Sequence, residues 1–180
     1  MHFSHLRDRT FLTLVSLFSF YSQVALAGDD NSNFGHMTLN GLQAIAVEVD
    51  GIHRNFMRFG LDRETVLQTT TNILHENGLD VVDLAQAKSI PDAALMRIKL
   101  NANENQYGFY YYGISIELKR KIALDNSAGG FISATIWQKG NTGIVMPTEM
   151  RKINALISGL LADVVNDYHA QNPNRVSSVR

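Results

Sequence analysis

The chain has 180 residues, with 16 Lys and Arg against 17 Asp and Glu, a formal charge of -1, and no cysteine. The lack of cysteine excludes disulfide scaffolds, thiolate metal sites, iron–sulfur clusters, cysteine nucleophiles and lipid anchoring through a cysteine. The near-neutral charge argues against a nucleic-acid partner, because proteins that bind polyanions usually carry a marked basic excess.

Residues 1–27 have the pattern of a Sec-type signal peptide. Arg7 and Arg9 precede the apolar run Phe11–Tyr21, and Ala25-Leu26-Ala27 is a small-x-small cleavage site. We therefore expect cleavage after Ala27 and a periplasmic or secreted mature protein. The apolar run has about half of the roughly 20 residues that cross a bilayer, so it does not predict a membrane anchor. No later stretch of the sequence predicts a transmembrane segment.

The rest of the chain predicts one domain with flexible ends. Residues 28–40 are polar and aperiodic, which is typical of a flexible leader. Residues 41–173 carry the periodic patterns of a single α+β domain, and residues 174–180 predict a flexible tail. This length suits one domain with its own core, which must stabilise the fold without disulfides.

The first half of the domain predicts a strand, a helix and a second strand. A strand is expected over residues 42–50, where Ile45, Val47 and Val49 alternate with smaller or polar residues. A helix follows over residues 63–77, with Asp62 as its N-cap and Gly78 as its C-terminal stop. Residues 79–84 read as a short strand. Such a unit forms a right-handed crossover, so the two strands should be parallel.

The next section predicts three antiparallel strands. Apolar residues occupy the even positions over 94–102, alternating with Leu95 and then with polar residues, and they occupy the even positions from Tyr110 to Leu124 with only Arg120 breaking the series. The second of these strands is unusually long, so we expect a bend near Gly113 or a hairpin that projects beyond the sheet. The third strand should cover residues 131–138 and end at the glycine-containing segment 140–143.

A final helix is predicted over residues 148–171, where apolar side chains form a continuous stripe. Burial of this stripe roughly balances the conformational entropy of ordering the helix, so the helix must dock on the sheet. The predicted fold class is therefore α+β. We expect a two-layer sandwich with a mixed, mostly antiparallel sheet in the order β-α-β-β-β-β-α and both helices on one face.

No motif predicts an enzyme, a cofactor or a metal site. The histidines beyond the signal peptide lack metal-ligand spacing; they are His36, His53, His75 and His169. Nucleophile elbows, phosphate-binding loops and dinucleotide fingerprints are absent from the sequence. Glu48 and Asp50 share one strand face and have the spacing for acid–base work, but a solvated strand end is the favoured interpretation.

The most distinctive segment is aromatic. Tyr107, Phe109 and Tyr111 have the parity opposite to the apolar positions of their strand, so we expect them on the exposed sheet face. Trp137 is expected beside them, opposite Glu117 or Lys119. These four aromatic residues form the candidate binding surface. The alternatives are that loops, the leader or a second copy of the chain cover them. The edge strand is also a candidate for β-augmentation by a partner.

Several segments resemble a group of uncharacterised exported proteobacterial proteins. They are Gly60-Leu61, Leu74-x-x-x-Gly78-Leu-x-Val81, the strand around Met96–Leu100, Thr135-Ile-Trp137-x-x-Gly140, and the ending Val165–Pro173. The order of elements is also similar to that of small bacterial envelope modules such as the TolB amino-terminal domain and CsgG-like domains. The resemblance implies an envelope location and a structural or binding role. It also implies that Gly60, Trp137 and the Asn-Pro ending are fold markers.

Three functional hypotheses follow, in order of preference. The first is a non-enzymatic periplasmic binding or scaffold module of the envelope, which contacts a protein partner or another copy of itself through the aromatic face or the edge strand. The second is a carrier of a small apolar or glycan ligand between helices and sheet. The third is an envelope hydrolase that uses Glu48 and Asp50.

Overall fold

The computed structural model describes residues 39–52, 54–123 and 130–173, which lie in one compact unit of the chain. The predicted signal peptide, residues 28–38 of the predicted leader and the predicted tail at 174–180 lie outside the described residues. No helix within the described ranges is both long and apolar enough to cross a membrane.

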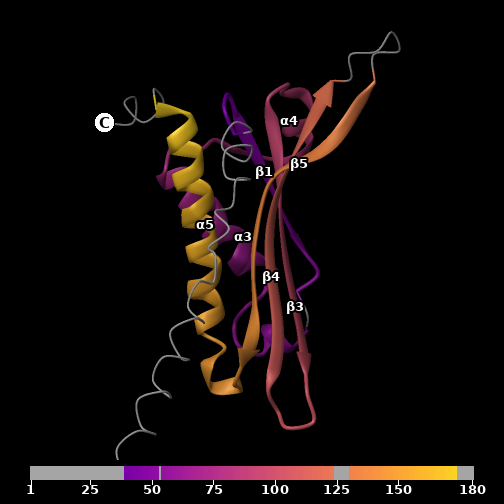
Figure 1. The fold of residues 1–180 in the computed structure, drawn as a ribbon, viewed down its shortest axis with the longest axis vertical. Helices are drawn as coiled ribbons and strands as arrows, with labels where there is room; N and C mark the ends of the chain where they lie inside the picture. Colours follow the sequence, from indigo (N-terminus) through magenta and orange to yellow (C-terminus); the bar gives the residue numbers. More distant parts are fainter. Residues whose placement is uncertain (1–38, 53, 124–129, 174–180) are drawn as a thin grey trace, which may run out of the picture. The chain divides into compact units, whose positions relative to one another are not determined.

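Five strands form one mixed sheet (Figure 1). The strands lie in the order β2, β1, β3, β4, β5, with the bounds Val81–Val82, Ala44–Asp50, Ala93–Glu104, Tyr110–Ala123 and Phe131–Val145. β1 is parallel to both of its neighbours, whereas the β3–β4 and β4–β5 pairs are antiparallel. The predicted α+β class and the parallel pairing of the first two strands are therefore confirmed.

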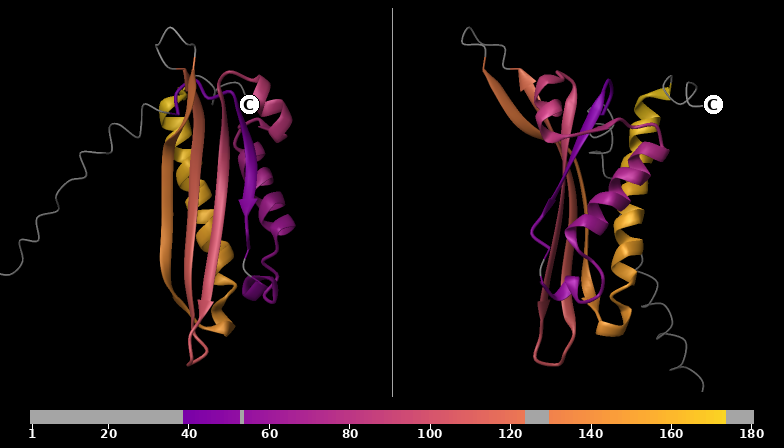
Figure 2. Two further views of the ribbon diagram at one scale, coloured as in Figure 1. Left: turned by 90° about the vertical axis from the view of Figure 1, so that its right-hand side faces the viewer. Right: turned by 180° about the vertical axis from the view of Figure 1, so that it is seen from behind.

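Two long helices cover one face of the sheet (Figure 2). They are α3 (Arg63–Glu76) and α5 (Lys152–Gln171). The shorter helical elements are α2 (Arg54–Met57), α4 (Leu84–Ser89) and the 3-10 helix η1 (Pro147–Glu149). The sequence patterns did not predict α2 or α4. The opposite face of the sheet is called the open face below.

Capping interactions fix the starts of α3 and α4. Asp62 is the N-cap of α3, as predicted, and its carboxylate accepts a hydrogen bond of 2.8 Å from a backbone N–H of the first turn. Asp83 accepts a similar bond of 2.7 Å from the N–H of Gln86, whose side chain accepts from the N–H of Asp83. This reciprocal capping box turns the chain into α4. The strand predicted over 79–84 is for this reason reduced to Val81–Val82.

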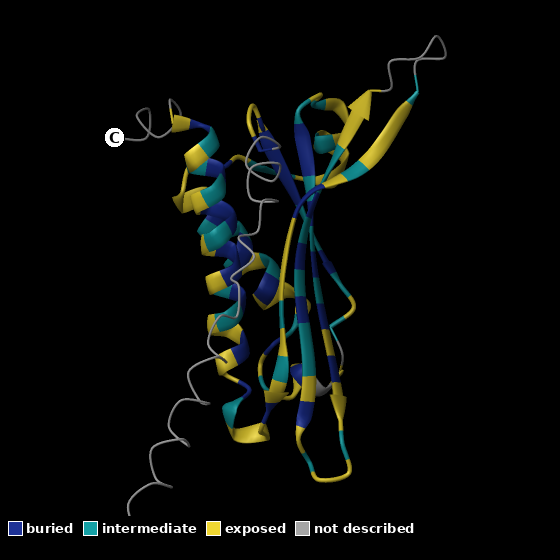
Figure 3. Cartoon of the chain, viewed as in Figure 1, coloured by how far each residue is buried: buried dark blue, intermediate teal, exposed yellow. Residues whose placement is uncertain are grey.

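The core lies between the sheet and the two long helices, where buried residues gather in Figure 3. Even-numbered side chains of β3 and β4 face the helices and are buried, namely Met96, Ile98, Leu100, Ile114, Ile116 and Leu118. The apolar stripe of α5 packs against this face of the sheet. Thr70 of α3 is also buried, and its hydroxyl donates a 2.8 Å hydrogen bond to the carbonyl of Val66. This bond satisfies a polar group that would otherwise destabilise the core.

A β-bulge reverses the parity of β5 and makes the prediction for Trp137 wrong. Leu118 pairs with Trp137, but the next residue of β4, Lys119, pairs with Thr135. Ile136 is the extra residue, so odd positions beyond it turn towards the helices. Trp137 is consequently only 8% exposed, and its indole N–H donates a 2.8 Å hydrogen bond to Asp167 of α5.

β5 also continues through the glycines that were expected to end it. Gly143 lies opposite Tyr112, and a Cβ atom at Gly143 would lie 2.8 Å from the Tyr112 hydroxyl oxygen. Glycine therefore leaves room for this ring, whose hydroxyl donates a 2.8 Å hydrogen bond to Asn141. Residues 140–143 are part of β5 because their small side chains fit against β4. The predicted end of the strand at 140–143 is therefore wrong.

The projecting hairpin expected from the length of β4 is present. The ladder between β3 and β4 ends at Arg120, while Lys121–Ala123 pair only with Phe131–Ser133 of β5. These six residues are called the arm, and Ile122, Phe131 and Ile132 on it are exposed (Figure 3).

The two ends of the described domain are tied together. The N–H of Leu39 donates a 2.7 Å hydrogen bond to the side chain of Gln171, and Leu39 is fully buried. The side-chain amide of Asn172 donates to the carbonyl of Leu39 at 3.0 Å and accepts from the N–H of Gly41 at 3.0 Å. The packed structure thus includes Leu39, two residues ahead of the predicted domain start at 41. It also gives the Asn-Pro ending a structural role.

Candidate protein-binding surface

Three of the predicted binding residues gather where β3 turns into β4. Tyr107 is 74% exposed, Tyr111 50% and Phe109 38%. Asn105 organises the turn, because its side-chain oxygen accepts hydrogen bonds from the N–H groups of Tyr107 and Phe109 at 2.9 and 3.0 Å. Gly108 allows the turn to close, since its φ of 78° is a conformation that side chains disfavour. The exposure predicted for these three rings is therefore confirmed.

β5 adds two apolar side chains that the sequence interpretation missed. Ile144 lies directly opposite Tyr111 and is 62% exposed, and Met146 follows it on the same side at 45%. They were missed because the strand was expected to end near residue 138. No alternation in the sequence marks them, because Ile144, Val145 and Met146 are all apolar. We call this group the end patch; it comprises Tyr107, Phe109, Tyr111, Ile144 and Met146.

The end patch rests on a packed base. Tyr110, between Phe109 and Tyr111, points into the core and is 4% exposed. Its ring meets Phe59 edge-on, with 6.1 Å between the ring centroids. Burial, together with a hydrogen bond to Glu104, raises the pKa of the Tyr110 hydroxyl. Tyr110 is thus anchored in the core, while its neighbours Phe109 and Tyr111 point outward. This anchoring holds the exposed rings in defined positions.

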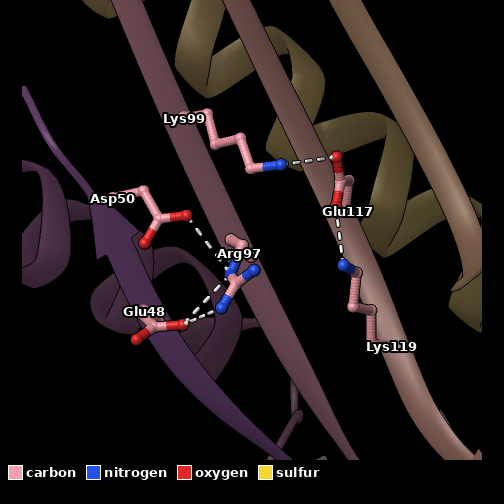
Figure 4. Close-up of polar contacts among 6 residues, drawn as sticks. All are labelled: Glu48, Asp50, Arg97, Lys99, Glu117 and Lys119. Atoms are coloured by element: carbon pink, nitrogen blue, oxygen red, sulfur yellow. Dashed lines mark hydrogen bonds and ion pairs between the residues drawn. The ribbon is translucent and has the colours of Figure 1, made fainter. Parts of the chain in front are cut away.

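The middle of the open face carries charges (Figure 4). On β1 and β3, Arg97 donates to Glu48 at 3.0 and 3.1 Å and forms a 3.3 Å ion pair with Asp50. On β3 and β4, Glu117 pairs with Lys99 at 3.1 Å and with Lys119 at 3.3 Å. We call these six residues the charge ladder. Glu48 and Arg97, and Lys99 and Glu117, are pairs of opposite charge across neighbouring strands, as favourable cross-strand pairs are, whereas Lys119 pairs with Glu117 along β4.

The charge ladder gives Glu48 and Asp50 a shared partner in Arg97. Both carboxylates contact the same guanidinium, and the hydrogen bond to Glu48, with the charge of Asp50, raises the pKa of Arg97. The geometry therefore favours a structural role for this pair, as a solvated cross-strand ion-pair cluster.

The described histidines do not form a metal site. His169 lies with its Nε2 atom 3.1 Å from the carbonyl oxygen of Asn77, which links α5 to the end of α3. Among residues with described placement, no group of three His, Cys, Asp or Glu side chains is positioned to hold a metal ion. His36 and His53 lie outside the described residues.

The outer edge of β5 carries two features that hinder strand addition. One is the bulge at Ile136, and the other is Lys139, which pairs with β4 at Ile116 and reaches Asp163 of α5 at 2.8 Å. Bulges and inward-pointing charges on edge strands are devices that oppose edge-to-edge pairing. The end patch is consequently a better candidate contact surface than the edge of β5.

Comparisons with known proteins give only loose structural likenesses. No protein-family model matches the chain, and no curated protein matches it. Among solved structures, the chain is similar to a dodecamer of PelC from Paraburkholderia phytofirmans, at 16% identity and a TM-score of 0.40 over 70% of this chain and 87% of that one. It is also similar to a minor lipoprotein from Acinetobacter baumannii, at 13% identity and a TM-score of 0.32 over 73% of this chain and 95% of that one.

Proposed function

We propose that this chain is a non-enzymatic protein-binding module of the bacterial envelope, and that the end patch contacts the protein partner. The observation that carries the proposal is the gathering of five exposed apolar side chains at one end of the open face. Contiguous exposed apolar surface on a folded domain is a sign of an interaction site. The signal-peptide pattern of residues 1–27 supports placing this activity in the periplasm.

The chemistry of the end patch suits a protein partner. Tyr107 and Tyr111 offer large rings with polar hydroxyl groups, and tyrosine is among the residues that most often dominate binding energy at protein interfaces. Phe109, Ile144 and Met146 supply apolar area around them. Full burial of a Phe or Ile side chain contributes about 1.5 to 3 kcal/mol, so a few such contacts support a specific complex.

The partner is best identified by crosslinking in the native envelope. A photo-reactive residue placed at Ile144 should capture one specific protein, because that side chain is central to the end patch and exposed. The same probe at Gln138, which is exposed on the open face opposite Glu117, serves as the control. Equal capture from both positions would contradict the proposal.

A pair of triple variants then tests the surface itself. Phe109→Ser, Tyr111→Ser and Ile144→Ser together should raise the Kd for the captured partner at least tenfold, which is about 1.4 kcal/mol. The matched control truncates the exposed apolar residues of the arm, Ile122, Phe131 and Ile132, to serine and should leave the Kd unchanged. Both triple variants should unfold at similar temperatures. A patch variant that binds normally, or that unfolds while the arm variant stays folded, would overturn the proposal.

A further inference from the structure

A second candidate site lies at the far end of the open face from the end patch. There, a pocket of about 200 Å³ lies between α4 and the strands β3, β4 and β5. Its lining is apolar on the side of α4 and on the floor, formed by Leu84, Ala87, Ile90, Pro91, Ala93 and Leu95. The capping box at Asp83 positions α4 over this part of the sheet, so the pocket belongs to the folded framework.

The polar side of the pocket is basic. Lys88 of α4 and Lys119, Arg120 and Lys121 of β4 line it, and no Asp or Glu is among its lining residues. Positive charge beside apolar walls favours an anionic ligand, and two of these four cations have carboxylate partners. The pocket therefore combines an apolar chamber with a cationic side, whereas the chain as a whole is close to neutral.

Two of these cations are already engaged, and two are available. Arg120 pairs with Asp92 and also donates to the carbonyl of Asn40 at 3.4 Å, while Lys119 pairs with Glu117. Lys88 and Lys121 are exposed, and neither forms an ion pair with another residue of the described ranges. As far as the described residues go, their ammonium groups are available to meet the charge of a ligand.

We propose that this pocket binds a small amphipathic anion, with its alkyl chain against Leu84, Ala87 and Leu95 and its anionic head at Lys88 and Lys121. The pocket volume is below the range of about 300 to 1,000 Å³ that drug-sized ligands occupy, so the alkyl chain of the ligand should be short. Lysine binds carboxylate and phosphate groups as a mobile point charge, which suits a single anionic head. The site is separate from the end patch, and it holds or fails independently of the protein-binding proposal.

Calorimetric and NMR titrations of the chain can test the site with octanoate and octyl phosphate as probes. At least one probe should bind saturably and shift the amide signals of α4 and of residues 93–95. Octanol, which has the same chain without the charge, should bind at least tenfold more weakly. Acetate and inorganic phosphate, which lack the alkyl chain, should bind as weakly as octanol does. Binding should weaken at high salt, because Lys88 and Lys121 are exposed to screening. The better of the two probes identifies the head group.

Variants separate the two halves of the pocket. Lys88→Gln with Lys121→Gln should weaken binding at least tenfold without affecting the fold, because both side chains are exposed. The matched control is Arg63→Gln with Arg151→Gln, which removes the same charge from exposed positions on α3 and beside α5 and should bind normally. Ala87→Phe should fill the pocket and abolish binding.

Three results would overturn the proposal. One is octanol that binds as tightly as the anions, another is equal affinity of the lysine and arginine double variants, and the third is undiminished binding by a folded Ala87→Phe variant. If Ala87→Phe does not fold, the affinities of the lysine and arginine double variants still test the proposal.

Discussion

The two faces of the sheet are stabilised in different ways, and adjacent residues of β4 show the contrast. Ile116 is fully buried against the helix layer, while Glu117 points to the open face between Lys99 and Lys119. The first contributes through burial and close packing, whereas the second contributes through ion pairs that remain partly in water. The helix-covered face should therefore contribute most of the free energy of unfolding.

The largest effect should come from a cavity on the helix-covered face. Ile116→Ala should lower the free energy of unfolding by about 2 to 5 kcal/mol, because it removes packed atoms from a site that cannot fully collapse. Ser115→Ala, one residue away on the open face, should change it by less than about 0.5 kcal/mol. Urea denaturation of both variants measures the difference. Similar midpoints for the two variants would show that the faces are not distinct in energy.

Trp137 gives a sharper test, because the bulge moves it from the open face to the covered one. Trp137→Phe should cost about 1 to 3 kcal/mol, since Asp167 of α5 loses its indole donor in a partly buried place. Trp137 is the single tryptophan of the sequence, so fluorescence reports on it alone. Its emission in the native protein should be blue-shifted and poorly quenched by acrylamide.

A red-shifted emission, readily quenched, would instead place the indole on the open face and contradict the bulge. An Asp167→Asn variant is a useful control. Its side-chain oxygen can still accept the indole hydrogen bond, so it should leave the emission maximum close to that of the native protein.

Much of the covered face could be predicted from the sequence because its signals are periodic and local. Alternation identified Ile114, Ile116 and Leu118 of β4 as core, although Ile122 in the same series is exposed on the arm. Asp62 and Gly78 marked the ends of α3. The parallel crossover followed from the order of the elements and the handedness of such connections. Each of these features depends on residues close in sequence, and each survives in the folded structure.

The errors arise where pairing between strands overrides local pattern. The bulge at Ile136 depends on how β5 aligns with β4, which alternation within β5 does not encode. The continuation of β5 through Gly143 depends on the space that Tyr112 requires across the ladder. Only three of the five residues of the end patch were predicted for the same reason, because Ile144 and Met146 belong to it only when β5 extends past residue 138.

The smallest expected effect lies on the open face and depends on pH. Glu117→Gln should lower the free energy of unfolding at pH 7 by about 1 kcal/mol, because it removes two partly screened ion pairs. Hydrogen bonds from Lys99 and Lys119 lower the pKa of Glu117 in the folded protein from its ordinary value of 4.5. A carboxylate whose pKa is depressed by folding stabilises the protein above the unfolded pKa, and this contribution disappears as the pH falls through the folded pKa.

The stability difference between native protein and Glu117→Gln should therefore be constant from pH 7 to about pH 5 and shrink steadily below 4.5. Denaturation series at several pH values measure it, and 1 M salt should reduce it at pH 7 because the charges are accessible to ions. A difference that persists unchanged at pH 3 would mean that Glu117 stabilises the sheet by packing against its neighbours. The distinction between the two faces would then be one of degree, because burial would contribute on both.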